Sequence, residues 1–136
     1  MYAKLLRANY VRNRRNYYDK NYIFGVCEGR HEIPQVENYL FGHDVDPVDV
    51  ASLYNTVATG VPSDADHIDL YVTGLTAAIG AVVAYCTNNA IGLTLWHYNR
   101  DTAEYYPQDV ISVEVCPFCG GRTIGQSYYC PHCGSN

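Results

Sequence analysis

His67-Ile-Asp-Leu-Tyr-Val-Thr-Gly-Leu-Thr-Ala-Ala-Ile-Gly-Ala-Val-Val-Ala-Tyr-Cys-Thr-Asn-Asn89 is the stretch that decides the fold class of this chain. Residues 67–72 form a short apolar run that is typical of a buried strand. Thr73 and Gly74 then lead directly into a helix expected over residues 75–89, whose apolar positions follow helical spacing: Leu75, Ile79, Val82, Val83 and Cys86. A strand that feeds into a helix predicts one βα unit of a mainly parallel sheet.

The flanking segments extend this unit in both directions. Residues 21–27 are a second apolar run that ends at a turn, and residues 93–98 are a third. Asp46 and Pro47 predict a helix start, as N-cap and first helical residue, and Gly60 predicts its end. A turn at residues 99–102 leads to a further strand near Glu104. The predicted order is βαβαββ, a small Rossmann-like α/β domain over residues 21–112.

Two copies of the pattern Cys-Pro-x-Cys-Gly close the chain, at Cys116/Cys119 and at Cys130/Cys133. The two-residue gap lets both thiolates of a pair turn toward one point, and the duplicated spacing predicts one tetrahedral Zn²⁺ bound by four sulfurs. We therefore expect a zinc ribbon over residues 113–136, with a disulfide or redox role as the weaker alternative. This motif resembles the widespread Cys-Pro-x-Cys-Gly knuckle family. A closed shell of four thiolates makes such a metal structural.

Two further cysteines, Cys27 and Cys86, lie alone in apolar segments and are expected to be buried free thiols. Free thiols are typical of a reducing compartment, which favours a cytoplasmic location. No stretch approaches the length of apolar sequence that a membrane span needs. The sequence therefore predicts no membrane partner.

Charge divides the chain into a basic arm and an acidic body. Residues 1–20 hold six of the nine Lys and Arg and one acid, which gives +5, whereas residues 21–136 carry −10. The arm also contains tyrosines, a mixture compatible with nucleic-acid binding by the arm and the ribbon. Because the acidic body would repel a polyanion, docking of the arm on an acidic surface or oligomer formation is the favoured interpretation.

A ligand site is expected where the carboxyl ends of the parallel strands meet helix N-termini. Three predicted loops meet there, and polar side chains of the kind that hold phosphate or carboxylate lie on them. The candidate ligand residues are Arg30, His31, Thr73, Gly74, Thr76, His97, Asn99 and Arg100. Ordinary helix capping and surface ion pairs are the alternatives for the same residues.

Catalysis has weaker support than binding. The chain has neither a G-x-G-x-x-G fingerprint nor a Walker A sequence. His31 and Glu32 could act as acid and base on a phosphodiester, which keeps a cyclic-nucleotide phosphodiesterase as one alternative. A zinc-ribbon nucleic-acid-binding or regulatory protein is another. The leading hypothesis is a non-catalytic protein that binds a small anionic, nucleotide-like ligand.

Fourteen tyrosines, several in adjacent pairs, suit either base stacking or a homo-oligomer interface. The strings at residues 70–76, 93–102 and 104–108 resemble small phage anti-defence proteins that sequester nucleotide immune signals, of the anti-Thoeris type. This resemblance implies sequestration of a cyclic ADP-ribose-type messenger in the cytoplasm of the host.

Overall fold

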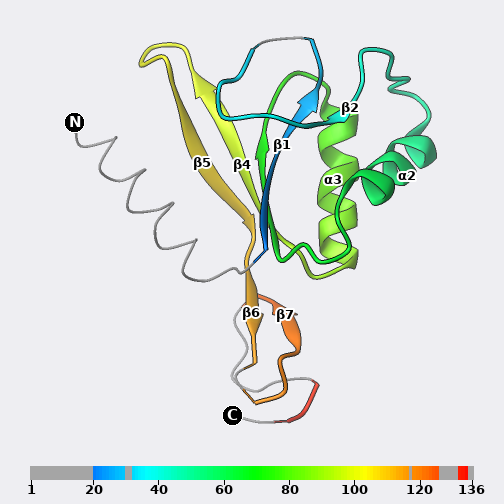
Figure 1. Cartoon of the computed structure of the whole chain (residues 1–136), viewed down its shortest axis with the longest axis vertical. Coiled ribbons are helices and arrows are strands. Elements are labelled where there is room, and N and C mark those ends of the chain that lie inside the picture. The colour runs from blue at the N-terminus through cyan, green and yellow to red at the C-terminus, as the bar shows by residue number, and fades with distance from the viewer. Residues whose placement is uncertain (1–19, 30–31, 117, 126–131, 135–136) are drawn as a thin grey trace.

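The computed structural model describes residues 20–29, 32–116, 118–125 and 132–134. Residues 1–19 of the basic arm, the candidate ligand residues Arg30 and His31, and the candidate metal ligand Cys130 lie outside these ranges. The described residues form a mainly parallel five-stranded sheet with two helices, followed by a small two-stranded hairpin (Figure 1). The predicted α/β class and mainly parallel sheet are confirmed.

The sheet has the strand order β2-β1-β3-β4-β5. Its parallel part consists of β2 (Tyr39–Phe41), β1 (Asn21–Cys27), β3 (His67–Tyr71) and β4 (Gly92–Asn99), and β5 (Glu104–Ile111) pairs with β4 in the antiparallel sense. The β4–β5 hairpin is the predicted antiparallel edge, although β5 is longer than the sequence suggested.

Strand β2 was not predicted, so the element order is ββαβαββ in place of βαβαββ. It is only three residues long and pairs with β1 at two positions, Gly25 with Tyr39 and Cys27 with Phe41. Gly25 permits this pairing because the ring of Tyr39 occupies the space where a Cβ on residue 25 would lie. A segment this short carries no periodicity of its own.

Helices α2 (Val50–Gly60) and α3 (Thr76–Asn88) pack on each other and cover one face of the sheet (Figure 1). Their buried residues meet alternate strand residues in one core, among them Leu53 and Val57 of α2, Val82 and Cys86 of α3, Val26, Ile68, Leu70 and Leu93. Burial of these large apolar side chains is the main stabilising term of the fold.

The predicted start of the first helix was wrong by three residues. Asp49, and not Asp46, is the N-cap of α2, and its side chain accepts a hydrogen bond from the Ser52 amide at 3.2 Å. Asp46 instead accepts from the Val48 amide at 3.0 Å, which closes a turn before the helix. Two aspartates within four residues offer the same capping chemistry, and only the path of the chain selects one.

Chain direction puts different segments on the two faces. The crossovers β2–α2–β3 and β3–α3–β4 both run toward β5, whereas the β1–β2 connection runs the opposite way. Right-handed crossovers therefore place both helices on one face and the described residues of the β1–β2 connection, 28–29 and 32–38, on the other. Ile33 of this connection packs on Tyr71 and Trp96 of that second face. At their carboxyl ends, β1 and β3 therefore send the chain in opposite directions along the sheet.

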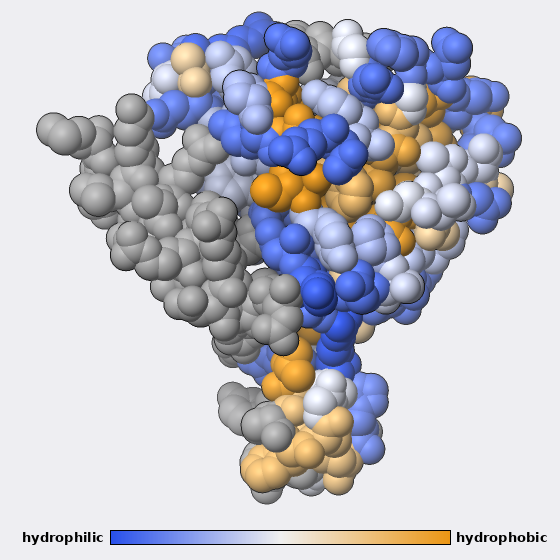
Figure 2. All heavy atoms as spheres, viewed as in Figure 1, coloured by the Kyte–Doolittle hydropathy of each residue, from blue (hydrophilic) through white to orange (hydrophobic). Residues whose placement is uncertain are grey.

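The ribbon hairpin follows the sheet without a break. Strands β6 (Val113–Val115) and β7 (Arg122–Ile124) pair in the antiparallel sense below the end of β5 (Figure 1). Apolar colour covers much of the described ribbon surface in Figure 2, where Val115, Phe118 and Ile124 are exposed. Neither described helix combines the length and apolar character that a bilayer span needs.

Candidate functional site

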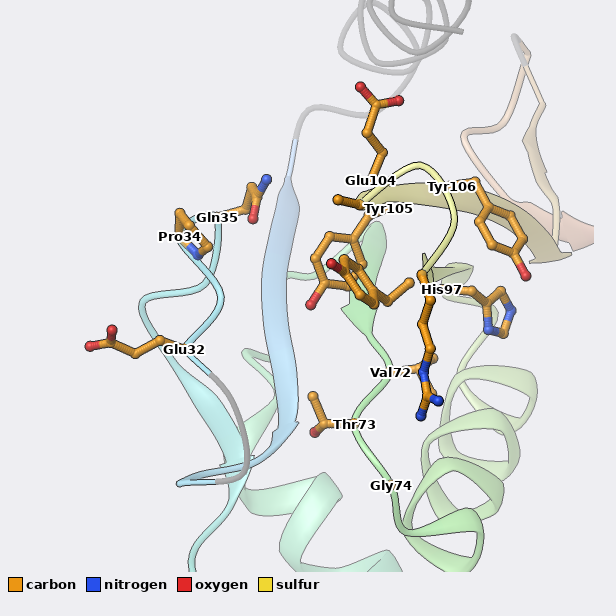
Figure 3. Close-up of a pocket in the computed structure, with 13 residues that line it drawn as sticks. Glu32, Pro34, Gln35, Val72, Thr73, Gly74, His97, Glu104, Tyr105 and Tyr106 are labelled. Carbon is orange, nitrogen blue, oxygen red and sulfur yellow. The ribbon is translucent and has the colours of Figure 1, made fainter.

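A cavity of about 770 Å³ lies at the carboxyl ends of the parallel strands (Figure 3). Three segments line it: the β1–β2 connection, the β3–α3 loop and the β4–β5 hairpin. Glu32 and Tyr106, at the two ends of this lining, are 74 residues apart in the sequence, and only the sheet brings the segments together. The described lining residues are Glu32, Pro34, Gln35, Val72, Thr73, Gly74, His97, Tyr98, Arg100, Ala103, Glu104, Tyr105 and Tyr106.

The β3–α3 loop forms the floor of the cavity. Thr73 is buried, and its Oγ1 accepts a hydrogen bond from the Cys27 amide at 3.2 Å, which ties the ends of β1 and β3 together. Gly74 has a φ of +77°, a conformation that favours glycine. The N-cap of α3 is Leu75, and no side chain caps this helix. Thr73 therefore does not have the helix-capping role that the sequence offered as an alternative.

Aromatic side chains line the hairpin side of the cavity. Tyr71 and Trp96 stack with an interplanar angle of 8°, and the Tyr105 ring meets Tyr71 edge-on at a centroid distance of 5.0 Å. Tyr98 lies beside Tyr105 at 5.2 Å and is half-exposed. Burial raises the pKa of Tyr105, so its hydroxyl stays protonated at neutral pH and can donate a hydrogen bond.

His97 and Tyr106 are opposite each other in the β4–β5 pairing, and their rings lie on the other side of the hairpin from Tyr105 (Figure 3). His97 Nε2 lies 2.7 Å from Gln108 Oε1. Because the amide oxygen can only accept, Nε2 carries the proton of the ring. The imidazole is thus oriented by a neutral partner.

The hairpin turn carries the cationic residue of the described lining, Arg100. Asn99 shapes this turn, since its Oδ1 accepts a hydrogen bond from the Asp101 amide at 2.9 Å. Ala103 has a φ of +56°, a strained conformation for a residue with a Cβ. The hydrogen bond of Asn99 and the positive φ of Ala103 thus define the shape of the turn that carries Arg100.

Two carboxylates also line the cavity, but both point out of it. The side chain of Glu32 extends away from Thr73, and that of Glu104 extends away from the Tyr105 ring (Figure 3). Charge repulsion from an outward-facing carboxylate is screened by solvent. The interior is therefore more favourable to an anion than the residue types suggest.

The structure brings together four of the eight candidate ligand residues, namely Thr73, Gly74, His97 and Arg100. Thr76, the first residue of α3, and Asn99 do not belong to the described lining. Sequence reasoning missed Tyr98, Tyr105 and Gln35. Tyrosine pairs were noted in the sequence, but the hairpin register that directs Tyr98 and Tyr105 to one face could not be derived from it.

Cys116, Cys119 and Cys133 form a cluster that could hold a metal ion. Their sulfur atoms all lie within 4.8 Å of one another, and the Cys116 and Cys133 sulfurs are 3.7 Å apart. Four thiolates at about 2.3 Å from a tetrahedral zinc are about 3.8 Å apart, so this spacing fits the ion. The fourth candidate ligand, Cys130, lies outside the described residues.

The glycine that follows the second cysteine of each pair has a left-handed backbone conformation. Gly120 and Gly134, each directly after a cysteine, have φ values of +73° and +76°. The Gly121 amide donates to Cys119 Sγ at 3.4 Å, and an amide that points at sulfur stabilises the thiolate. The described parts of the two knuckles thus carry the positive φ values and the amide-to-sulfur contact that suit ligand-bearing turns.

Arg122 joins the ribbon to the sheet. Its guanidinium donates to the Ala65 carbonyl at 3.1 Å and forms an ion pair with Asp66 just before β3. His132, the spacer residue of the second knuckle, donates from Nε2 to the Arg122 carbonyl at 2.8 Å. The knuckle, Arg122 and the start of β3 thus form one connected chain of contacts.

Comparison of this chain with protein-family models, with curated proteins and with solved structures finds no match. The resemblance to phage anti-defence proteins therefore receives no support from a family model. The chemistry of the cavity and of the cysteine cluster must be argued from their own residues.

Proposed function

We propose that the cavity binds a small anionic, nucleotide-like ligand and holds it without turnover. The observation that carries this proposal is the convergence of Thr73-Gly74, Arg100 and a tyrosine pair on one cavity of about 770 Å³. Ligand sites usually have volumes of about 300 to 1,000 Å³ and combine apolar walls with a few polar groups. A mononucleotide or a compact cyclic nucleotide suits such a space.

The position of the cavity supports the proposal. In Rossmann-like sheets, ligands bind where neighbouring strands send the chain in opposite directions, beyond their carboxyl ends. Strands β1 and β3 are such a pair, and residues after both strands line the cavity. A Rossmann-like arrangement with its ligand at this point is the interpretation that we favour.

Each half of a nucleotide has a suitable partner in the cavity. Arg100 can form paired hydrogen bonds with phosphate oxygens, and Gly74 lets the backbone approach them at the start of α3. Tyr98 and Tyr105 offer ring faces and edges to a base, with Tyr105 supported from behind by Tyr71. Stacking on an aromatic ring contributes about 1 to 3 kcal/mol per base.

Binding without turnover is favoured by the partner of His97. Its Nε2 donates to the Gln108 amide oxygen, and a neutral amide does not stabilise an imidazolium as a carboxylate would. The phosphodiesterase alternative rests on His31, which lies outside the described residues, and on Glu32, which points out of the cavity (Figure 3).

The test is to incubate the full chain with a panel of nucleotides, among them cyclic ADP-ribose-type messengers, and to denature it with heat. Mass spectrometry of the released molecules should show an intact nucleotide, enriched over a filtrate without protein. Release of a cleaved nucleotide would show turnover and contradict sequestration. Absence of any bound nucleotide across the panel would overturn the proposed ligand class.

Arg100→Gln tests the anionic half of the ligand. Loss of a charge-assisted hydrogen bond should raise the dissociation constant about 10- to 100-fold. Asp101→Asn is the matched control, since Asp101 lies in the same turn but is not part of the described lining. Calorimetric titration should give unchanged binding for the control, and equal weakening of both variants would argue against a direct role for Arg100.

Zinc is the metal that we propose for the cysteine cluster, with Cys130 as the fourth ligand. Cys116, Cys119 and Cys133 supply three soft thiolates at the spacing that zinc requires. A shell of four cysteines leaves no open position, so the ion would stabilise the ribbon and take no part in chemistry at the cavity. Metal analysis should give one zinc per chain, and a Cys130→Ser variant should bind it more weakly.

A further inference from the structure

The face of the sheet that lies opposite the helices is polar along much of its length. Side chains alternate between the two faces of a strand, so residues 67, 69 and 71 of β3 face away from the core that contains Ile68 and Leu70. Those three residues are a histidine, an aspartate and a tyrosine. Four neighbouring strands contribute to the same surface, which we call the second face: Asn21, His67, Asp69, Thr94, Trp96 and Asp109.

Hydrogen bonds connect the residues of the second face. Asn21 Nδ2 donates to Asp69 Oδ2 at 2.9 Å, which leaves its Oδ1 to accept from His67 Nδ1 at 2.6 Å. Trp96 Nε1 donates to the other oxygen of Asp69 at 2.7 Å. Thr94 donates to Asp109 Oδ1 at 2.7 Å and lies 3.1 Å from His67 Nε2. The arrangement orients two carboxylates, Asp69 and Asp109, on one surface.

This surface is buried although both described helices lie on the opposite face. His67, Asp69, Thr94 and Trp96 have exposed fractions of 2%, 7%, 0% and 2%. Among the described segments, the 28–38 connection packs on this face through Ile33, near Trp96. Burial raises the pKa of Asp109, because the charged carboxylate loses solvation there. A mostly parallel sheet needs cover on both faces.

The chain before β1 has the charge and the reach to provide this cover. Residues 1–19 contain five Lys and Arg against one Asp. Lys20 fixes their point of departure, because its amide donates to Asp66 Oδ2 at 3.1 Å and its carbonyl accepts from the Asp66 amide at 2.9 Å. Nineteen residues would span about 28 Å as a helix, whereas a sheet of five strands is about 19 Å wide. The segment is therefore long enough to cross the sheet.

We propose that residues 1–19 dock on the second face of the sheet in the same chain, with their arginines toward Asp69 and Asp109. Attachment at Lys20 favours the chain's own surface over a second copy, since a tethered segment has an effective concentration in the millimolar range. The arm then covers the second face of the sheet, and its positive charges interact with carboxylates of the same chain.

Trp96 is the sole tryptophan of the chain and lies on the second face, so its fluorescence reports on the cover directly. A chain that begins at Lys20 should show red-shifted Trp96 emission and at least twofold stronger quenching by acrylamide. A synthetic peptide of residues 1–19 should reverse both effects, and a scrambled peptide of the same composition should not. Unchanged emission and quenching in a truncated chain that stays folded by circular dichroism would overturn the proposal.

A full-length variant keeps the test decisive if the truncated chain does not fold. Replacing Arg12, Arg14 and Arg15 by Gln removes the positive charge while the chain keeps its length. Trp96 quenching should rise, and in the parent chain it should rise as salt increases from about 50 to about 500 mM, because exposed parts of the interaction are screened. Quenching that neither the substitutions nor salt alter would contradict a charge-driven contact with this face.

Light scattering separates docking within one chain from exchange between two chains. Docking in the same chain predicts Trp96 quenching that does not change with protein concentration. Quenching that falls as a dimer forms would show that the arm covers the face of a second copy, and would overturn docking within one chain. Tight, salt-sensitive binding of nucleic acid that releases Trp96 from protection would show that the arm serves an external polyanion, and would overturn the proposal as well.

Discussion

Single residues in this protein often have a role that their type does not reveal. Thr73 has the sequence context of a helix cap or a phosphate ligand, yet its Oγ1 accepts a hydrogen bond from Cys27 on the neighbouring strand. This hydrogen bond to β1 therefore fixes the position of Thr73 in the wall of the cavity. Arg122 likewise lies in a segment that could face solvent but binds the start of β3.

Thr73→Val should lower the free energy of unfolding by about 1 to 3 kcal/mol, because the isosteric side chain removes a buried acceptor from the Cys27 amide. Urea unfolding followed by circular dichroism measures this change. Thr73→Ser keeps the hydroxyl and should lose less than half as much. A larger loss for Thr73→Ser than for Thr73→Val would show that the methyl group, and not the hydrogen bond, is what matters.

Cys86 should make the protein less stable at alkaline pH. Burial raises the pKa of its thiol to about 12, whereas an unfolded thiol titrates near about 8.5. Above that lower value the unfolded chain loses a proton that the folded chain keeps, so the free energy of unfolding falls by about 1.4 kcal/mol per pH unit, up to the folded pKa.

Cys86→Ala removes this contribution, and its free energy of unfolding should fall less steeply between about pH 9 and pH 11. Tyr22 and Tyr105, whose pKa values are also raised, remain in both proteins, so the difference between the two slopes isolates the thiol. Parallel pH curves would contradict the assignment.

At the level of elements, α2 shows how a boundary depends on tertiary context. Asp46 and Asp49 both have a side chain suited to an N-cap, and Pro47 favours the first of them. The structure uses Asp49 for the helix and Asp46 for the preceding turn. The short strand β2, which pairs with β1, lies before this turn along the chain.

Asp49→Ala should lower the free energy of unfolding by about 0.5 to 2 kcal/mol, because it removes the cap from the Ser52 amide. Asp46→Ala is the matched control and should cost less, since Asp46 closes a turn before the helix and caps no helix amide. Thermal unfolding of both variants gives the comparison. A larger loss for Asp46→Ala would mean that the helix begins where the sequence alone suggested.

At the level of the whole molecule, the ribbon and the sheet are joined through a few polar contacts. His132 binds the Arg122 carbonyl, and the Arg122 side chain binds Ala65 and Asp66. Asp66 in turn binds the backbone of Lys20, directly before β1. The geometry of the knuckles is therefore connected to the start of the two central strands.

Removal of the zinc that we propose for the cysteine cluster, with a chelator, should expose the ribbon thiols to alkylation while Cys27 and Cys86 stay protected, because these two are buried in the core. The melting temperature of the sheet should fall at the same time. Arg122→Gln should lower the stability of the metal-loaded protein by about 1 kcal/mol, discounted for partial exposure, and should reduce the effect of chelation. An unchanged response to chelation would show that the ribbon and the sheet are independent.

Features that depend on local spacing could be predicted from the amino-acid sequence. Strands β1, β3 and β4, helix α3 and the paired cysteine knuckles follow from apolar periodicity and from short fixed gaps, which act within a few residues. These features gave the mainly parallel sheet and placed Thr73, Gly74, His97 and Arg100 near one edge.

Features that depend on contacts between distant segments became visible only in the folded chain. Strand β2 exists because it pairs with β1, Tyr98 and Tyr105 share a face because of the hairpin register, and the second face is polar because residues of four strands meet there. Such contacts are made by residues far apart in the chain, and no local pattern encodes which of many compatible partners will lie opposite.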